Sequence, residues 1–221
     1  MQPDPANPGG ADALEVPLQL DGPRAAPAQV VLAHGAGAGM HSDFMAAIAH
    51  GLARRGLRVC RFEFPYMHAD RRSPDRQPVL EDTYRQVVSR LLKGEKAPLF
   101  VGGKSLGGRI ASHIVGEVAA RGVFFLGYPL HPPGKPERAR VANLAAVTVP
   151  MLFVQGTRDP FCPLEALERF LASHPGPAQV AVVEDGDHTL KVRRTSGRST
   201  AEAWQQAVDA VADWIGGLSA S

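Results

Sequence analysis

The chain has 221 residues, of which 24 are basic and 22 acidic, so its formal net charge is +2. This length suits one domain with a sizeable core, and 44% hydrophobic residues is an ordinary share for a globular protein. The near balance of charge argues against nucleic acid as a partner, no apolar run is long enough to span a membrane, and two cysteines are too few for a disulfide framework.

The chain opens with a polar stretch, residues 1–12, that is rich in Pro, Gly, Asn and Asp. This stretch has neither the basic segment nor the apolar segment of a secretory signal. We therefore predict a disordered tail and a cytoplasmic protein. Residues 13–221 are predicted to form a single domain, because no repeat and no domain boundary is visible in them.

Short apolar runs alternate with longer amphipathic stretches along the rest of the chain. Strands are predicted at 13–20, 29–33, 57–64, 99–101, 123–126, 151–155 and 179–183. Helices are predicted after Ser42, at 79–93, at 109–120, around 138–144, at 164–172 and at 200–218, with a polar loop at 66–78. This alternation is typical of a mostly parallel sheet covered by helices on both faces. Such sheets bind ligands at the carboxyl ends of their strands.

The first helix is predicted from its flanking residues and its apolar face. The side chain of Ser42 is expected to cap its start. Phe44 and Ile48 recur at helical spacing on its apolar face. Gly51 and Gly56 are expected to mark the region where it ends.

A serine between glycines follows the strand at 99–101. Gly103-Lys104-Ser105-Leu106-Gly107 fits the pattern G-x-S-x-G, which is typical of a sharp turn that exposes a serine nucleophile between a strand and a helix. The glycines are expected because side chains there would clash with the strained serine. Gly-Lys-Ser also ends the phosphate-binding motif G-x-x-x-x-G-K-[ST], but that motif needs glycine where this chain has Pro98. Ser105 is therefore predicted to be a nucleophile.

A serine nucleophile needs a general base, and the base needs an acid that orients it. On a sheet of this kind the acid and then the histidine follow the serine along the chain. Asp159 and His188 each lie just past a predicted strand. We predict His188 as general base and acid and Asp159 as the orienting carboxylate. Asp185 and Asp187 are the alternatives for the acid, although their closeness in sequence to His188 makes a productive approach harder.

Backbone N–H groups are expected to stabilise the oxyanion that forms when the serine attacks. One is the N–H of Leu106, at the start of the helix after the serine. The other should come from the glycine-rich loop after the strand at 29–33. We predict the N–H of Ala36, with Gly37 as the alternative, and we expect His34 to hold this loop in place.

The motifs together resemble those of the α/β-hydrolase superfamily. They are His-Gly-Ala-Gly-Ala-Gly at 34–39, Gly-Gly-Lys-Ser-Leu-Gly-Gly-Arg at 102–109, Gly-Thr-Arg-Asp-Pro at 156–160 and Gly-Asp-His at 186–188. Residues 62–67 (Phe-Glu-Phe-Pro-Tyr-Met) and 127–135 (Gly-Tyr-Pro-Leu-His-Pro-Pro-Gly-Lys) resemble a compact bacterial dienelactone-hydrolase-like group. That group is related to α/β-hydrolase-like subunits of a eukaryotic chromatin complex (KAN/NSL). The resemblance covers the chain from about residue 29 onward.

The resemblance implies a three-layer α/β-hydrolase fold with a minimal cap or none, since few residues separate Val123 from Met151. It implies a serine hydrolase that cleaves a small ester, thioester or similar acyl bond through an acyl-enzyme. The partner would be a small-molecule acyl substrate, and the triad implies neither a metal nor an organic cofactor. Dienelactone hydrolases use a cysteine nucleophile, so the serine in its place argues against a dienelactone substrate.

Substrate contacts in such an open site are expected from Tyr66, Met67 and His131. The alternative interpretation is a non-catalytic binding or scaffold protein that keeps the fold, because a fold alone does not fix a function. Completeness of the site favours the enzyme, since a degenerate site usually lacks a triad member or the oxyanion loop.

Overall fold

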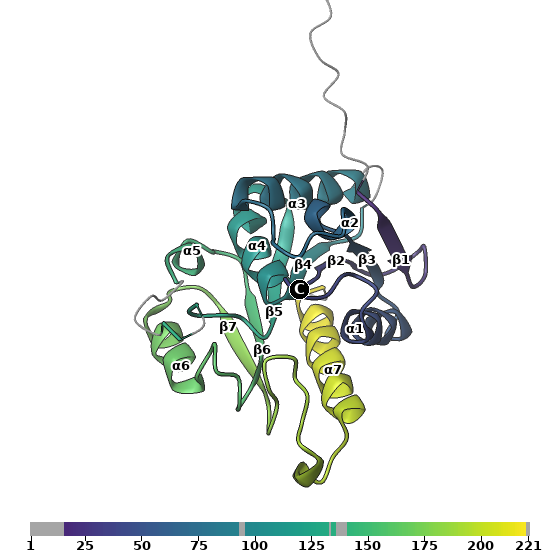
Figure 1. Ribbon diagram of the computed structural model, residues 1–221. Coiled ribbons are helices and arrows are strands. Elements are labelled where there is room, and N and C mark those ends of the chain that lie inside the picture. The colour runs from purple at the N-terminus through teal and green to yellow at the C-terminus, as the bar shows by residue number, and fades with distance from the viewer. Residues whose placement is uncertain (1–15, 93–95, 133, 136–140, 220–221) are drawn as a thin grey trace, which may run out of the picture.

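The computed structural model describes residues 16–92, 96–132, 134–135 and 141–219. Residues 1–12, predicted to be a disordered tail, lie outside the described residues, as do residues 13–15 of the first predicted strand. Figure 1 shows a central sheet with helices on both of its sides. This is the three-layer arrangement that the alternation of strands and helices predicted.

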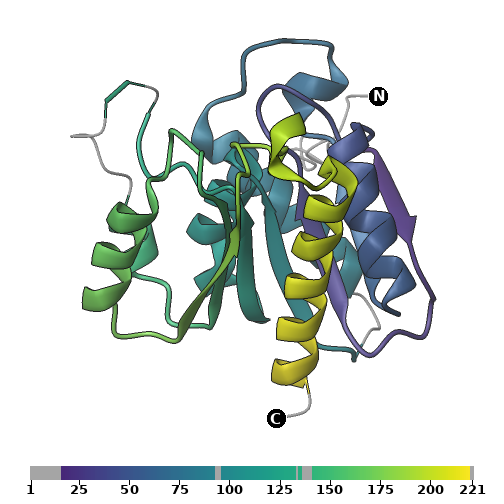
Figure 2. The same ribbon diagram turned by 90° about the horizontal axis from the view of Figure 1, so that it is seen from below.

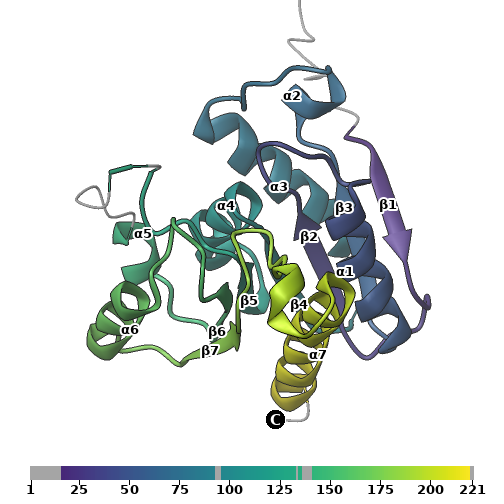
Figure 3. The same cartoon turned by 60° about the horizontal axis from the view of Figure 1, so that its bottom comes forward.

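Within the described residues, seven strands form one sheet in the order β1-β3-β2-β4-β5-β6-β7. They are β1 (Leu18–Asp21), β2 (Gln29–Ala33), β3 (Arg58–Phe62), β4 (Leu99–Lys104), β5 (Ala120–Leu126), β6 (Met151–Gly156) and β7 (Ala178–Val183). β1 pairs with β3 in the antiparallel sense, and the other neighbours are parallel. β1 and β7 lie at opposite edges (Figure 3). β2, β4 and β6 are buried along their whole length, as expected for parallel strands covered on both faces.

Helices cover the two faces of the sheet unequally. They are α1 (Asp43–Arg54), α2 (Pro65–His68), α3 (Gln77–Leu92), α4 (Leu106–Ile114), α5 (Ala142–Ala145), α6 (Leu164–Ser173) and α7 (Thr200–Ser219). α1 and α7 stand side by side over one face (Figure 2), and α3, α4 and α6 pack on the other. Two separate hydrophobic cores result, one on each side of the sheet.

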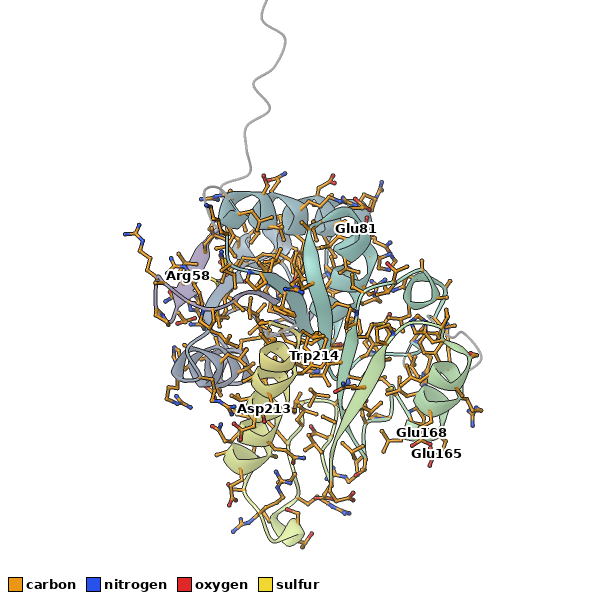
Figure 4. All side chains as sticks on the ribbon, turned by 180° about the vertical axis from the view of Figure 1, so that it is seen from behind. Arg58, Glu81, Glu165, Glu168, Asp213 and Trp214 are labelled. Carbon is orange, nitrogen blue, oxygen red and sulfur yellow. The ribbon has the colours of Figure 1, made fainter. Side chains whose placement is uncertain are left out.

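The contact between α7 and the sheet depends on the inward side of that helix. Trp214 is buried and stacks edge-on against Phe100 of β4, with ring centroids 5.6 Å apart. A Cβ on Gly122 would lie only 2.6 Å from Trp214 Cη2, so the indole packs directly on the β5 backbone. The preceding residue, Asp213, is largely exposed (Figure 4) and pairs with Arg55, the residue that follows α1.

Two predictions about the first helix were wrong in detail. Ser42 stands at the start of α1, but its side chain makes no capping hydrogen bond. Gly51 does not mark the end, because α1 continues to Arg54. A Cβ on Gly51 would lie 2.5 Å from Val208 Cγ2, so this glycine lets α1 and α7 approach closely. Gly56, with φ of +84°, is the glycine that turns the chain after the helix.

Other boundaries also differ from the prediction. The predicted loop at 66–78 contains α2, which Pro65 starts with its fixed φ, and the first residues of α3. The predicted helix at 109–120 ends at Ile114, and a 3₁₀ turn over Val115–Glu117 leads into β5. Gly116 explains the early end, since glycine is a poor helix former. Of the predicted helical patch at 138–144, residues 138–140 lie outside the described part of the chain.

Between β5 and β6, the only helix in the described residues is α5, which is a single turn. The described part of this segment therefore contains no helical cap. Among the described helices, none combines the length and the apolarity needed to cross a bilayer.

Candidate active site

Ser105 occupies a strained turn between β4 and α4. Its backbone has φ of 49° and ψ of −109°, a conformation that residues with side chains rarely adopt. A Cβ on Gly103 or on Gly107 would lie 2.4 Å from the carbonyl oxygen of Ala33 at the end of β2. The two glycines are therefore required, but the clash that they avoid is mainly with β2 and not with Ser105, as the sequence argument had assumed.

The structure brings the side chains of Ser105, His188 and Asp159 together from the loops after three strands, β4, β7 and β6. Ser105 Oγ lies 2.8 Å from His188 Nε2, and His188 Nδ1 lies 2.7 Å from Asp159 Oδ2. A neutral imidazole with its proton on Nδ1 donates to Asp159 and accepts the serine hydroxyl on Nε2. This tautomer makes both hydrogen bonds at once.

The carboxylate of Asp159 is buried and well supplied with donors. Gln155 Nε2 donates to Oδ2 over 2.6 Å, and the backbone N–H of Phe161 donates to Oδ1 over 2.9 Å. These hydrogen bonds replace those that the carboxylate would make to water, and they fix the orientation of the carboxylate plane. The Phe161 ring also packs edge-on against the His188 imidazole, with centroids 4.6 Å apart. Gln155 and Phe161 are supporting residues that sequence reasoning missed.

The two alternative acids have other partners. Asp187 Oδ1 accepts from the backbone N–H groups of Thr189 and Lys191, and so closes the turn that carries His188. Asp185 accepts from Arg193, whose guanidinium lowers the pKa of that carboxyl. The geometry therefore favours Asp159 over both of them as the partner of the imidazole.

The predicted oxyanion donors lie beside Ser105. Leu106 is the first residue of α4, where backbone N–H groups have no acceptor within the helix. Ala36 and Gly37 are exposed in the loop after β2 and line a cleft together with Ser105. This placement suits N–H donors at the positive end of a helix and in an adjacent loop.

Two buried rings support that loop from below. His34 donates from Nδ1 to the carbonyl of Gly35 over 2.7 Å and accepts the Phe64 N–H on Nε2 over 3.0 Å. Burial lowers the pKa of His34, which matches a neutral ring in these roles. The Tyr66 hydroxyl lies 3.1 Å from the carbonyl oxygen of Ala36 and 3.3 Å from that of Gly35. His34 thus holds the loop as expected.

Two of the expected substrate contacts are placed elsewhere. Tyr66 is fully buried, lies under the loop after β2 and lines neither cleft at Ser105. Met67 packs against the hydrophobic core on the α3 side of the sheet and also lines neither cleft. His131 does line a cleft, and its Nδ1 donates to the carbonyl of Pro132 over 2.9 Å.

Two clefts open on either side of Ser105 and share Ala36 and His188 as lining residues. The first, of about 530 Å³, has an apolar wall of Phe44, Met45 and Trp204. The second, of about 320 Å³, has both apolar lining residues, such as Leu80 and Phe161, and polar ones, such as Gln77, Arg109 and His131. Among the described residues there is no cluster of three His, Cys, Asp or Glu side chains suited to a metal ion.

Lys104 is a further residue that sequence reasoning passed over as a variable position of the motif. It is only 6% exposed, and its ammonium group has no hydrogen-bond partner among the described residues. Burial lowers its pKa to about 8, while the charges of Asp159 and Asp187 act in the opposite direction.

The sheet order and the strained serine at the turn between β4 and α4 define an α/β-hydrolase fold. The sequence model of the alpha/beta hydrolase domain family matches residues 26–216, and the chain therefore belongs to that family.

Solved structures agree with this assignment. A serine hydrolase without a lid from Xanthomonas campestris is 19% identical, with 90% of this chain and 89% of that chain covered and a TM-score of 0.72. A dienelactone hydrolase from Anabaena variabilis is 18% identical, with 93% of both chains covered and a TM-score of 0.73. Est1E from Butyrivibrio proteoclasticus is 16% identical, with 96% and 97% covered and a TM-score of 0.70. These likenesses confirm the predicted fold class, whereas the relationship to the chromatin-complex subunits stays a prediction.

Proposed function

We propose that this protein is a serine hydrolase that cleaves a small ester, thioester or similar acyl bond. The observation that carries the proposal is the unbroken chain of hydrogen bonds from Ser105 through His188 to Asp159, with distances of 2.8 and 2.7 Å. A serine hydroxyl is a weak nucleophile at neutral pH, and an adjacent imidazole oriented by a carboxylate activates it.

The proposed reaction has two halves. Ser105 Oγ attacks the acyl carbon while its proton moves to His188 Nε2, and the N–H groups of Leu106 and Ala36 stabilise the oxyanion. The bond to the leaving oxygen or sulfur then breaks as His188 returns the proton to it, which leaves an acyl-enzyme. A water molecule, deprotonated by His188, then attacks the same carbon. The bond from that carbon to Ser105 Oγ breaks as His188 returns the proton to Oγ, which releases the acid and restores the serine. Asp159 keeps the imidazole in the required tautomer throughout.

The first cleft offers a fixed apolar surface to part of the substrate. In the first cleft, Trp204 and Phe44 meet edge-on with centroids 5.4 Å apart, and Trp204 Nε1 donates to the carbonyl of Thr189 over 3.0 Å. The ring is thus fixed as an apolar wall beside the loop that carries His188. In the second cleft, Arg109 donates to Gln77 over 3.2 Å and both side chains face the opening. We assign an apolar group of the substrate to the wall of the first cleft that Phe44, Met45 and Trp204 form.

Hydrolysis of a panel of short esters and thioesters tests the assignment of Ser105. Wild type is expected to turn over at least one member, and Ser105→Ala should lower kcat by at least about a thousandfold. Ser173→Ala on α6 is the matched control, because it makes the same change in an exposed position away from both clefts, and it should keep wild-type rates. Equal turnover by Ser105→Ala and wild type would refute the role of Ser105. A folded wild type that hydrolyses no member would favour the binding-protein alternative.

The assignment of the clefts has its own test. Trp204→Ala should lower kcat/KM for phenyl-substituted esters by about tenfold, since it removes the aromatic wall, and should change kcat/KM for methyl acetate little. Equal losses for both esters would contradict an apolar subsite at Trp204.

A further inference from the structure

Lys104 lies directly beneath the proposed active site. In β4, Phe100 packs into the core under α1 and α7 and Val101 into the opposite core. Side chains alternate along a strand, so Lys104 turns to the same side as Phe100. Its stem packs against the loop after β2, where a Cβ on Gly35 would lie 3.3 Å from Lys104 Cγ. The residue next to the proposed nucleophile therefore points to the α1 and α7 side of the sheet, under the loops that form the site, where it also lines the first cleft.

The ammonium group of Lys104 faces Asp159 across Gly127. A Cβ on Gly127 would lie 3.3 Å from Lys104 Nζ, 3.5 Å from Asp159 Oδ2 and 2.8 Å from the carbonyl oxygen of His188. Gly127 has φ of +68° and carries no side chain that would separate these groups. The charge thus lies close to the carboxylate oxygen that binds His188 Nδ1, without a direct ion pair to it among the described residues.

The other charged groups around Lys104 come from the loops after β6 and β7. Asp159 and Asp187 both raise its pKa against the effect of burial, which lowers that pKa to about 8. The ammonium is therefore protonated at neutral pH. His34, from the loop after β2, is buried with a lowered pKa and adds no charge. Burial of an ammonium group without a hydrogen-bond partner costs folding free energy. We therefore expect Lys104 to make a compensating contribution to stability or to function.

We propose that Lys104 is a positioning residue that offsets the charge of Asp159, so that His188 remains an unprotonated base at lower pH than Asp159 alone would allow. The inference rests on the proposed function, which makes His188 the base. The carboxylate of Asp159 stabilises the imidazolium form of His188, and the ammonium of Lys104 opposes that stabilisation. Loss of the ammonium leaves the carboxylate uncompensated and raises the pKa of His188. Because the ammonium group and the imidazole lie on either side of the same buried carboxylate, the expected change is about one pH unit.

The test measures the titration of His188 directly. Histidine-labelled protein is titrated by NMR, and the His188 signal is identified by its absence in His188→Gln. Lys104→Met removes the charge and keeps an apolar stem of similar length, Lys104→Arg keeps the charge, and Lys96→Met on the exposed segment before β4 is the control. The midpoint for His188 should rise by about one pH unit in Lys104→Met, stay within a few tenths in Lys104→Arg and not change in Lys96→Met.

The acid limb of the pH profile of kcat/KM should move to higher pH by the same amount in Lys104→Met. Lys104→Gln is a second neutral variant, for use if the methionine variant does not fold. A neutral variant that titrates like wild type would overturn the proposal. So would equal shifts in Lys104→Met and Lys104→Arg, because packing and not charge would then be responsible. The NMR titration needs no turnover, so it separates failure of this inference from failure of the hydrolase assignment.

Discussion

Two buried tyrosines provide a matched test of how the loop after β2, which carries the proposed oxyanion donors Ala36 and Gly37, is held in place. Tyr66→Phe removes a hydroxyl that lies 3.1 and 3.3 Å from the carbonyl oxygens of Ala36 and Gly35. Ala36 is exposed, so water can replace part of this bond, and we expect a loss of about 1 kcal/mol in the free energy of unfolding. The loop that supplies a proposed oxyanion donor loses its support. Removal of a whole donor costs a factor of about 10² to 10³ in kcat, so a displaced donor should cost about tenfold.

Tyr84→Phe is the control, since it deletes the same atom from another fully buried tyrosine. The Tyr84 hydroxyl lies 2.9 Å from the carbonyl of Val31 and 2.8 Å from that of Gly102, and it accepts the Gly102 N–H over 3.0 Å. These groups are buried inside the sheet, and leaving them unpaired should cost about 2 to 4 kcal/mol.

The two variants should therefore rank in opposite order in stability loss and in loss of hydrolytic activity. Urea unfolding should find Tyr84→Phe the less stable, and ester hydrolysis well below the unfolding transition should find Tyr66→Phe the slower. Wild-type kcat/KM in Tyr66→Phe would refute the support role of Tyr66, as would a greater loss of kcat/KM in Tyr84→Phe.

The remaining predictions concern the acid and the glycines. Asp159→Asn should lower kcat by a factor of about 10⁴, because an amide favours the wrong tautomer of the His188 imidazole. Asp187→Asn should keep most of the activity. If steady-state kinetics gave the reverse order, Asp187 and not Asp159 would be the acid. Gly107→Ala should lower the free energy of unfolding by about 2 to 3 kcal/mol, since its Cβ would meet the carbonyl of Ala33 at 2.4 Å. Gly216→Ala, in an exposed and open position of α7, should instead raise it by about 0.5 to 1 kcal/mol, and equal effects in thermal melts would contradict the account of the turn.

The sequence predicted the frame of the fold well because each buried strand is a compact apolar run. The predicted strand at 29–33 coincides with β2, and those at 151–155 and 179–183 fall within one residue of β6 and β7. Helix ends were less predictable, because tertiary contacts decide them. Gly51 has the appearance of a helix terminator, but the close approach of Val208 places it inside α1.

The residues of the candidate site also differ in how well the sequence predicts their place. Strand ends and chain order restricted the choice to Ser105, Asp159 and His188, and in the structure His188 forms hydrogen bonds with the other two side chains. Tyr66 was assigned to the substrate because sequence does not reveal whether a polar tip points into a cleft or under a loop. Lys104 was overlooked because its proposed role depends on its closeness to Asp159 across Gly127. Gly127 lies at the end of a neighbouring strand, and no local sequence pattern connects it to Lys104.

The central claim, that Ser105 is an activated nucleophile, is tested most directly by labelling with a fluorophosphonate. Ser105 Oγ would displace fluoride from phosphorus and form a stable Ser–O–P bond, while its proton passes to His188. We predict that wild type is labelled and that peptide mapping places the label on Ser105. We also predict that His188→Gln, which removes the base, reacts at least a hundredfold more slowly, by about the factor that a general base contributes. Labelling at a different serine, or equal rates in the wild type and His188→Gln, would contradict the account.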